Sequence, residues 1–143
     1  MTRPLTPHGP GFRFLDTFHI AENHGCGTWH LAPDLWFFAS HFPGNPLTPA
    51  ALLMEFGAQT AGAYWMHTTG ADAGTPLFVA SLDGMRIQSA ALPGETLQAT
   101  TTLVKAFATL AQFEFEITSA GRPVARGRVT LSSQLAEEKS PAG

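Results

Sequence analysis

The sequence predicts an α+β fold in which a long central helix is wrapped by one curved antiparallel sheet. Residues 50–67 form an apolar run of helical length with no polar stripe, and a helix of this kind is normally enclosed. Strand-like segments follow it, separated by turn residues. Strands clustered on one side of a helix, without a regular helix–strand alternation, are typical of a helix packed on an antiparallel sheet.

The 143 residues suit one domain with a single hydrophobic core. Residues 1–10 carry three prolines and little apolar pattern, so we expect a flexible arm there. The domain itself is expected over residues 11–132. Residues 133–143 are polar and charged, and we expect them to form a disordered tail.

The composition favours a protein that is partly covered by another subunit. Charged residues make up 13% of the chain, about half the usual share of roughly 25%. The eight Lys and Arg residues are scattered and the net charge is −3, which disfavours a nucleic-acid partner. The single cysteine cannot form an intrachain disulfide, which suits a cytoplasmic protein. No apolar segment is long enough to span a bilayer, so we expect no membrane partner.

Two segments before the helix are predicted to be strands. Residues 12–20 read as one strand with a bend at Asp16, and residues 28–31 alternate with Trp29 and Leu31 on one face. The glycines that flank Cys26 permit a turn or bulge between them.

The helix has a clear start signal. Thr48 is a suitable N-cap residue, and Pro49 fits the first helical position, where a missing N–H has no cost. The helix is expected to run from Ala50 to about His67.

Four strands are predicted after the helix, and we expect them to follow one another as antiparallel hairpins. Gly84 permits a bulge in the first of them, and Pro93-Gly94 and Ala120-Gly121 are turn signals. The predicted strands are residues 77–88, 95–107, 110–118 and 123–132.

Glu55 is the only formally charged side chain between Asp34 and Asp72. A carboxylate that faces an apolar core without a partner is costly, so Glu55 either points to water or is held in a pocket for a purpose. The second interpretation, with His41 as the partner, fits the apolar surroundings better.

The segment around these two residues resembles a known family. The pattern is His41-Phe-Pro-Gly-x-Pro-x-x-Pro, followed by a small-residue helix with Glu55-x-x-x-Gln59. It is similar to the FabZ/FabA-type 3-hydroxyacyl-thioester dehydratases, which have hot-dog folds. Glu55 lies 14 positions after His41, which is the spacing of that family. The resemblance covers most of residues 10–132 and is specific within 41–59.

The resemblance implies roles that the chemistry of the side chains can meet. His41 is the expected base, since imidazole accepts a proton near neutral pH. Glu55 is the expected acid, since an apolar pocket raises the pKa of a carboxyl group and keeps it protonated. Backbone N–H groups of Ala50 and Ala51 at the helix start, with Gly44 in the preceding loop, are expected to bind the thioester oxygen.

The resemblance also implies an assembly. In that family the histidine and the glutamate of one site come from different subunits, so we expect a homodimer or a higher even oligomer, with a heterodimer as the alternative. Gln59 either orients the Glu55 carboxyl group or fills a buried polar gap. We expect no cofactor and no metal, because His19, His24 and His30 lack a metal-ligand spacing.

The chain departs from the family at the helix start and at the acid. Ala50 stands where the family has a glycine, which keeps the N–H but adds a methyl group near the thioester. The related dehydratase–isomerases carry Asp at the acid position, so Glu55 favours dehydration without isomerisation of the double bond.

Carrier recognition is the third departure. The family often has basic residues after Arg86, but here Ile-Gln-Ser follows. Arg86, Arg126 and Arg128 are then the candidates for contact with an acyl carrier protein or with phosphopantetheine, and a solvated strand face is the alternative for the last two. These changes favour a specialised polyketide or polyene enzyme over a general fatty-acid enzyme.

The leading hypothesis is therefore a dehydratase that converts 3-hydroxyacyl thioesters, carried by acyl carrier protein or coenzyme A, to trans-2-enoyl thioesters. One alternative is a hot-dog thioesterase, which also places an acidic residue on the central helix but needs no His-Phe-Pro-Gly loop. The other is a non-catalytic acyl-binding subunit of the same fold.

Overall fold

The computed structural model describes residues 5–69 and 76–134. The first four residues of the expected arm, the loop expected after the helix, and residues 135–143 of the expected tail lie outside the described residues.

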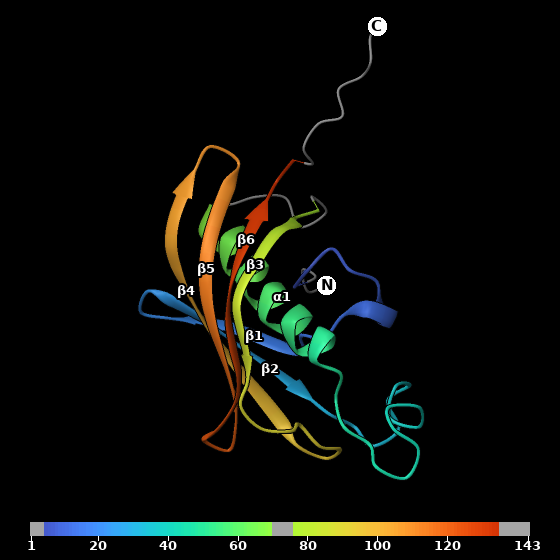
Figure 1. The fold of residues 1–143 in the computed structure, drawn as a ribbon. Helices are drawn as coiled ribbons and strands as arrows, with labels where there is room; N and C mark the ends of the chain where they lie inside the picture. The colour runs from blue at the N-terminus through green and yellow to red at the C-terminus, as the bar shows by residue number, and fades with distance from the viewer. Residues whose placement is uncertain (1–4, 70–75, 135–143) are drawn as a thin grey trace, which may run out of the picture.

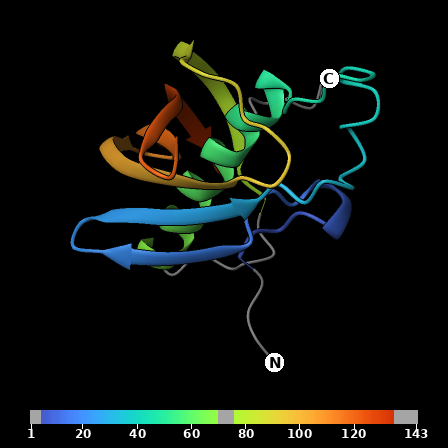
Figure 2. The same ribbon diagram turned by 90° about the horizontal axis from the view of Figure 1, so that it is seen from below.

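One long helix lies against the concave face of a curved, unclosed sheet, as the sequence predicts (Figure 1). Over the described ranges, the sheet has six antiparallel strands in the order β1-β2-β4-β5-β6-β3. Figure 2 shows the β1–β2 hairpin passing across one side of the helix and the other strands curving around the rest. The elements are a 3₁₀ turn η1 (Pro10–Phe12), β1 (Thr17–Ala21), β2 (His24–His30), α1 (Ala50–Thr69), β3 (Phe78–Ile87), β4 (Thr96–Phe107), β5 (Leu110–Ser119) and β6 (Arg122–Ser132).

The last four strands are not a run of hairpins, which corrects the expected strand order. β4–β5 and β5–β6 are hairpins, but β3 pairs with β6 and not with its sequence neighbour β4. The reason is that β4 already has β2 on one side and β5 on the other. The Pro93-Gly94 turn therefore lies in a connection between non-adjacent strands. The bulge expected at Gly84 is confirmed, since the β3–β6 register shifts there and Gly84 has a φ of 61°.

The first strand begins later than predicted. Residues 10–12 form the 3₁₀ turn, and the strand starts only at Thr17. The N–H of Phe14 is bonded to the Gln59 side chain of the helix, 2.9 Å away, instead of to a neighbouring strand. The bend expected at Asp16 is present, and its carboxylate accepts a 2.7 Å hydrogen bond from the N–H of His30.

Residues 5–10, which fall in the expected flexible arm, make contacts with the domain. Thr6 is 2% exposed, Leu5 packs against the core, and Arg13 donates a 2.8 Å hydrogen bond to the carbonyl oxygen of His8. This segment follows neither helical nor strand periodicity. The sequence pattern therefore does not predict its apolar and backbone contacts with the domain.

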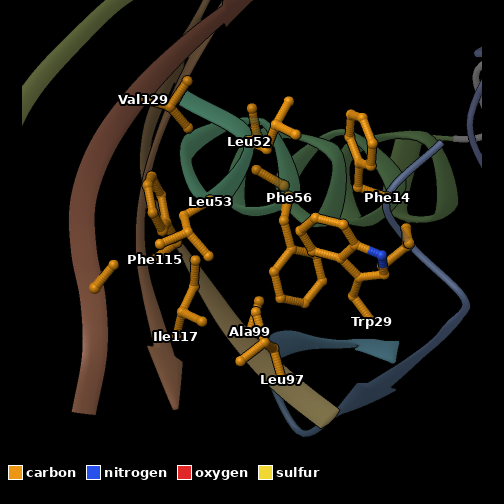
Figure 3. Packing of buried hydrophobic residues seen from close by; sticks show 14 of the residues in the cluster. Phe14, Trp29, Leu52, Leu53, Phe56, Leu97, Ala99, Phe115, Ile117 and Val129 are labelled. Atoms are coloured by element: carbon orange, nitrogen blue, oxygen red, sulfur yellow. The ribbon is translucent and has the colours of Figure 1, made fainter. Parts of the chain in front are cut away.

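The core forms where α1 meets the sheet (Figure 3). Phe56 is fully buried and its ring centroid lies 5.7 Å from that of Trp29 on β2. Gly57 faces the ring of Phe115 on β5 so closely that a Cβ atom there would lie 2.4 Å from a ring carbon. The helix can approach the sheet this closely only because the position has no side chain. Among the described residues, no helix is apolar over a length that could cross a membrane.

Two glycines of α1 offer a matched stability test. Gly57→Ala should lower the free energy of unfolding by about 1–2 kcal/mol, because overpacking against Phe115 outweighs the gain of about 1 kcal/mol in helix propensity. Gly62→Ala should leave stability unchanged or raise it, since its Cβ would meet its nearest neighbour at 3.5 Å. Urea unfolding of both variants measures the difference. Equal effects at the two sites would contradict the packing argument.

Candidate active site

His41 lies in the long loop, residues 31–49, that joins β2 to α1 and projects beyond the end of the sheet (Figure 1). Its Nδ1 is 3.0 Å from the carbonyl oxygen of Leu47, and its ring stacks on Phe42 with centroids 4.2 Å apart. A carbonyl oxygen only accepts hydrogen bonds, so Nδ1 carries the hydrogen in the neutral imidazole. The Nε2 lone pair is then free to take a proton.

Backbone hydrogen bonds fix the shape of this loop. The N–H of His41 donates to Phe37 at 3.0 Å, and the N–H of Leu47 donates back to His41 at 2.8 Å. Gly44 is exposed, and its φ of 74° is one that a glycine adopts without strain. Phe37 and Phe38 are buried and anchor the loop to the core. The imidazole is therefore held by a defined backbone and not by a free loop.

The helix start differs in detail from the prediction. The helix begins at Ala50, and the Thr48 hydroxyl group is buried without a hydrogen-bond partner among the described residues. Thr48 lies one position too early to cap the first turn, so the expected cap bond does not form. Ala50 and Ala51 are the first two helical residues and are exposed. N–H groups of a first helical turn have no partner within the helix.

Glu55 lies one turn further along α1, and its side chain is 23% exposed. Its Oε2 atom accepts a 3.0 Å hydrogen bond from Nε2 of Gln59. The same oxygen lies 3.5 Å from Nε2 of His8. Within one chain, the histidine beside Glu55 is therefore His8 and not His41.

Glu55 borders a small pocket between α1, the N-terminal segment and the β3–β6 side of the sheet. Its free volume is about 30 Å³, which is room for roughly one water molecule. The side chains of His8 and Gln59 also line this pocket and are polar. Its apolar walls are formed by Ala58, Met66, Leu77, Val79 and Leu131. In this arrangement the pocket is too small for an acyl chain.

The pKa of Glu55 runs against the sequence-based expectation. Burial raises the pKa, but the interaction with His8 and the hydrogen bond from Gln59 together outweigh burial, so the pKa is held below its ordinary value. In the single chain Glu55 is therefore a carboxylate at neutral pH. The sequence showed the apolar surroundings of Glu55, but it did not show the imidazole that the fold places beside it.

Gln59 is 2% exposed and forms three hydrogen bonds. Its amide nitrogen donates to Glu55 and, at 2.9 Å, to the carbonyl oxygen of Phe12, while its amide oxygen accepts from the N–H of Phe14 at 2.9 Å. The side chain is thus bonded both to the carboxylate and to the backbone of the segment that carries His8. Its role in orienting the acid stays a prediction.

The arginines lie elsewhere. Arg126 and Arg128 pair across the strands with Glu116 and Glu114 on the face of the sheet away from α1, and Arg128 lies 2.7 Å from Glu114. Both arginines line a surface hollow of about 420 Å³. Arg86, on β3, is exposed and lies opposite Arg126 in the register. These three residues do not line the Glu55 pocket within one chain. Their role in carrier contact stays a prediction.

His8 is the site residue that sequence reasoning missed. It lies in a proline-rich segment with no motif, and only the folded chain brings it to α1, 47 positions later. In the described ranges 5–69 and 76–134, no cluster of metal-binding side chains is found.

Gln59→Ala should loosen the N-terminal segment more than it disturbs the helix. The variant leaves the buried N–H of Phe14 without its acceptor, at a cost of about 1–3 kcal/mol. Hydrogen exchange of the Phe14 amide should accelerate by at least tenfold, while the matched exposed variant Gln98→Ala should leave it unchanged. Equal exchange in wild type and Gln59→Ala would show that this hydrogen bond does not hold the segment.

Comparison with known proteins places this arrangement in a class. The dehydratase heterocomplex ApeI:P from Xenorhabdus doucetiae superposes with a TM-score of 0.73 at 20% identity, covering 92% of this chain and 90% of that one. A hypothetical thioesterase with coenzyme A from Streptococcus pneumoniae superposes with a TM-score of 0.61 at 16% identity, covering 83% and 87%. The helix wrapped by a curved sheet is thus the hot-dog fold, which dehydratases and thioesterases share.

The sequence comparison is more specific. The family model of the FabA-like domain matches residues 6–128. A protein of Streptococcus uberis named 3-hydroxyacyl-[acyl-carrier-protein] dehydratase FabZ is 33% identical over 127 residues, which cover 88% of this chain and 90% of the relative. The chain therefore belongs to the FabA-like family.

Proposed function

We propose that this protein is a 3-hydroxyacyl-thioester dehydratase with His41 as base and Glu55 as acid. The observation that carries the proposal is the geometry of His41 in a FabA-like chain. Its Nδ1 is engaged by the Leu47 carbonyl oxygen, and its Nε2 has no hydrogen-bond partner among the described residues.

The proposed reaction moves two protons. Nε2 of His41 takes the proton from C2 of the acyl chain, and the C2–H electron pair forms the C2–C3 double bond. The C3–O bond breaks, and the departing hydroxyl leaves as water with a proton delivered by Glu55. Each such acid or base contribution typically amounts to 10²–10⁴-fold in rate.

The first turn of α1 supports the thioester. Negative charge gathers on the thioester oxygen as the C2 proton leaves, and N–H groups at a helix start stabilise such charge. Ala50 and Ala51 supply these groups beside the His41 loop, with Gly44 nearby in that loop as a further candidate. The methyl group of Ala50 narrows this position compared with a glycine, which favours selectivity for the acyl chain or the carrier.

We propose a dimer through the free edge of β3. This strand pairs with β6 on one side only, and Val79, Leu82 and Ile87 are 43%, 37% and 49% exposed. An exposed apolar edge strand is a template for pairing with a second chain. Val79 also borders the Glu55 pocket, so a second copy across this edge can bring its own loop to that pocket.

The His41 loop also has the character of a contact surface. Trp36 and Phe42 are 65% and 50% exposed although both are large aromatic residues. A homodimer or higher even oligomer that covers them would place His41 of one copy opposite Glu55 of the other. A heterodimer with a related chain would use the same surfaces.

The proposed substrate is carried by acyl carrier protein, as in the name of the Streptococcus uberis relative, or by coenzyme A. The arginines on the outer sheet face, Arg86, Arg126 and Arg128, are the proposed contacts for the carrier or for phosphopantetheine.

A fatty-acid pathway agrees with the relatives, and a polyketide or polyene pathway is the more specialised form of the proposal. A cytoplasmic location is proposed with it.

The purified protein should interconvert 3-hydroxyacyl and trans-2-enoyl thioesters without releasing free thiol. Mass spectrometry over a panel of acyl chains on both carriers detects dehydration as the loss of one water molecule. A thiol reagent run in parallel detects hydrolysis. Thiol release without a change in the acyl chain would instead assign the protein as a thioesterase. If neither product forms, the remaining interpretation is a non-catalytic acyl-binding subunit.

Complementation tests the shared site. His41→Ala and Glu55→Ala should each lower kcat by about 10²–10⁴-fold. Mixed after unfolding and refolding, the two variants should recover roughly a quarter of wild-type activity, because half of randomly formed dimers are mixed and each has one intact site. A mixture of each variant with itself is the control. No recovery from the mixed pair, with dimers confirmed by mass, would place both residues of a site in one chain.

A further inference from the structure

The Glu55 pocket holds a second histidine that the proposed reaction has not used. Nε2 of His8 lies 3.5 Å from Oε2 of Glu55, and the His8 side chain is 28% exposed. The segment that carries it is held in three ways: Thr6 is buried, Arg13 bonds the His8 carbonyl oxygen, and Gln59 bonds Phe12. The imidazole is therefore positioned on the carboxylate while part of it remains in contact with water.

The two oxygens of the carboxylate are used differently. Oε2 accepts the hydrogen bond from Gln59 and is the oxygen that lies beside His8. Oε1 has no hydrogen-bond partner among the described residues. A bound substrate can therefore approach Oε1 without displacing His8. Nδ1 of His8 is buried and has no partner within the described part of the chain, so Nε2 is the ring nitrogen that is engaged.

We propose that His8 is a positioning residue that holds a proton at rest and passes it to Glu55, which gives it to the leaving hydroxyl group. This inference rests on the proposed dehydration. The Nε2–H bond of His8 breaks as an Oε–H bond forms on Glu55. That Oε–H bond breaks in turn as the C3–O bond breaks and an O–H bond of water forms. His8 regains a proton from solvent, and His41 returns the C2 proton to solvent, so the protons balance.

The charges around the pair favour this arrangement. The interaction with His8 contributes to the lowered pKa of Glu55 against the opposing effect of burial, so the Glu55 carboxyl group is deprotonated at rest. Arg13 is the charged neighbour on the N-terminal segment, and it faces the His8 backbone. The helix adds the neutral Gln59, and the β3 and β6 sides of the pocket add the apolar Leu77, Val79 and Leu131.

The pair also sets the pH range of activity. The active form requires a neutral His41 and one proton on the His8–Glu55 pair. With His8 present, an imidazole can hold this proton for Glu55. Without His8, the proton must stay on the Glu55 carboxyl group alone, and a carboxyl group releases its proton at a lower pH than an imidazole does.

The test compares His8→Asn with wild type in the pH dependence of kcat. His8→Asn should lower kcat by about tenfold or more at pH 7.5 and move the basic limb of the profile down by about one pH unit, with KM little changed. His8→Lys, which keeps its proton to higher pH, should move the same limb upward. His19→Asn, at an exposed position on β1, is the matched control and should change neither limb.

A second readout needs no substrate. Carbon-13 NMR titration of the Glu55 carboxyl group should show a higher pKa in His8→Asn than in wild type, because burial remains and the His8 interaction is lost. An unchanged Glu55 titration, or a basic limb that is the same in both His8 variants, would overturn the inference. A wild-type protein that dehydrates nothing would overturn the proposed function instead, while the titration still reports on the pair.

Discussion

The enclosure of α1 is the constraint on which the rest of the structure depends. The helix is apolar on nearly every side, so it is stable only when a sheet and a covering segment surround it. The strands supply most of this cover, and the contact between Gly57 and Phe115 sets how closely they approach. Residues 5–15 close the remaining side. A carboxylate on such a helix is necessarily placed at a gap in the cover, and Glu55 lies at one.

Gln59 links that enclosure to the site. Its three hydrogen bonds connect the carboxylate on the helix with the backbone of the N-terminal segment. Because the side chain is almost fully buried, none of these bonds can be replaced by water without moving the segment. The position of His8 and the orientation of Glu55 therefore follow from one amide group, and a change in either reaches the other through it.

The two histidines of the proposed site are held in different ways. His41 is held by its own loop, with the Leu47 carbonyl oxygen fixing which ring nitrogen is free, and it needs a second copy to approach the carboxylate in the proposed dimer. His8 is held by tertiary contacts within the chain. In the proposed dimer, the protonation state of Glu55 would therefore depend on both folding and assembly.

The sequence by itself determined most of the local elements and indicated candidate site residues, because these are recorded in neighbouring positions. The all-apolar period of 50–67 predicted the enclosed helix, the alternation of 110–118 predicted a strand, and the spacing of His41 and Glu55 indicated the family. Only the tertiary structure decided that β3 joins β6, because strand partners depend on which edges are already occupied. It also decided that His8 lies against Glu55, since a contact across 47 residues leaves no local pattern and shifts the pKa of the acid in a direction that burial alone does not predict.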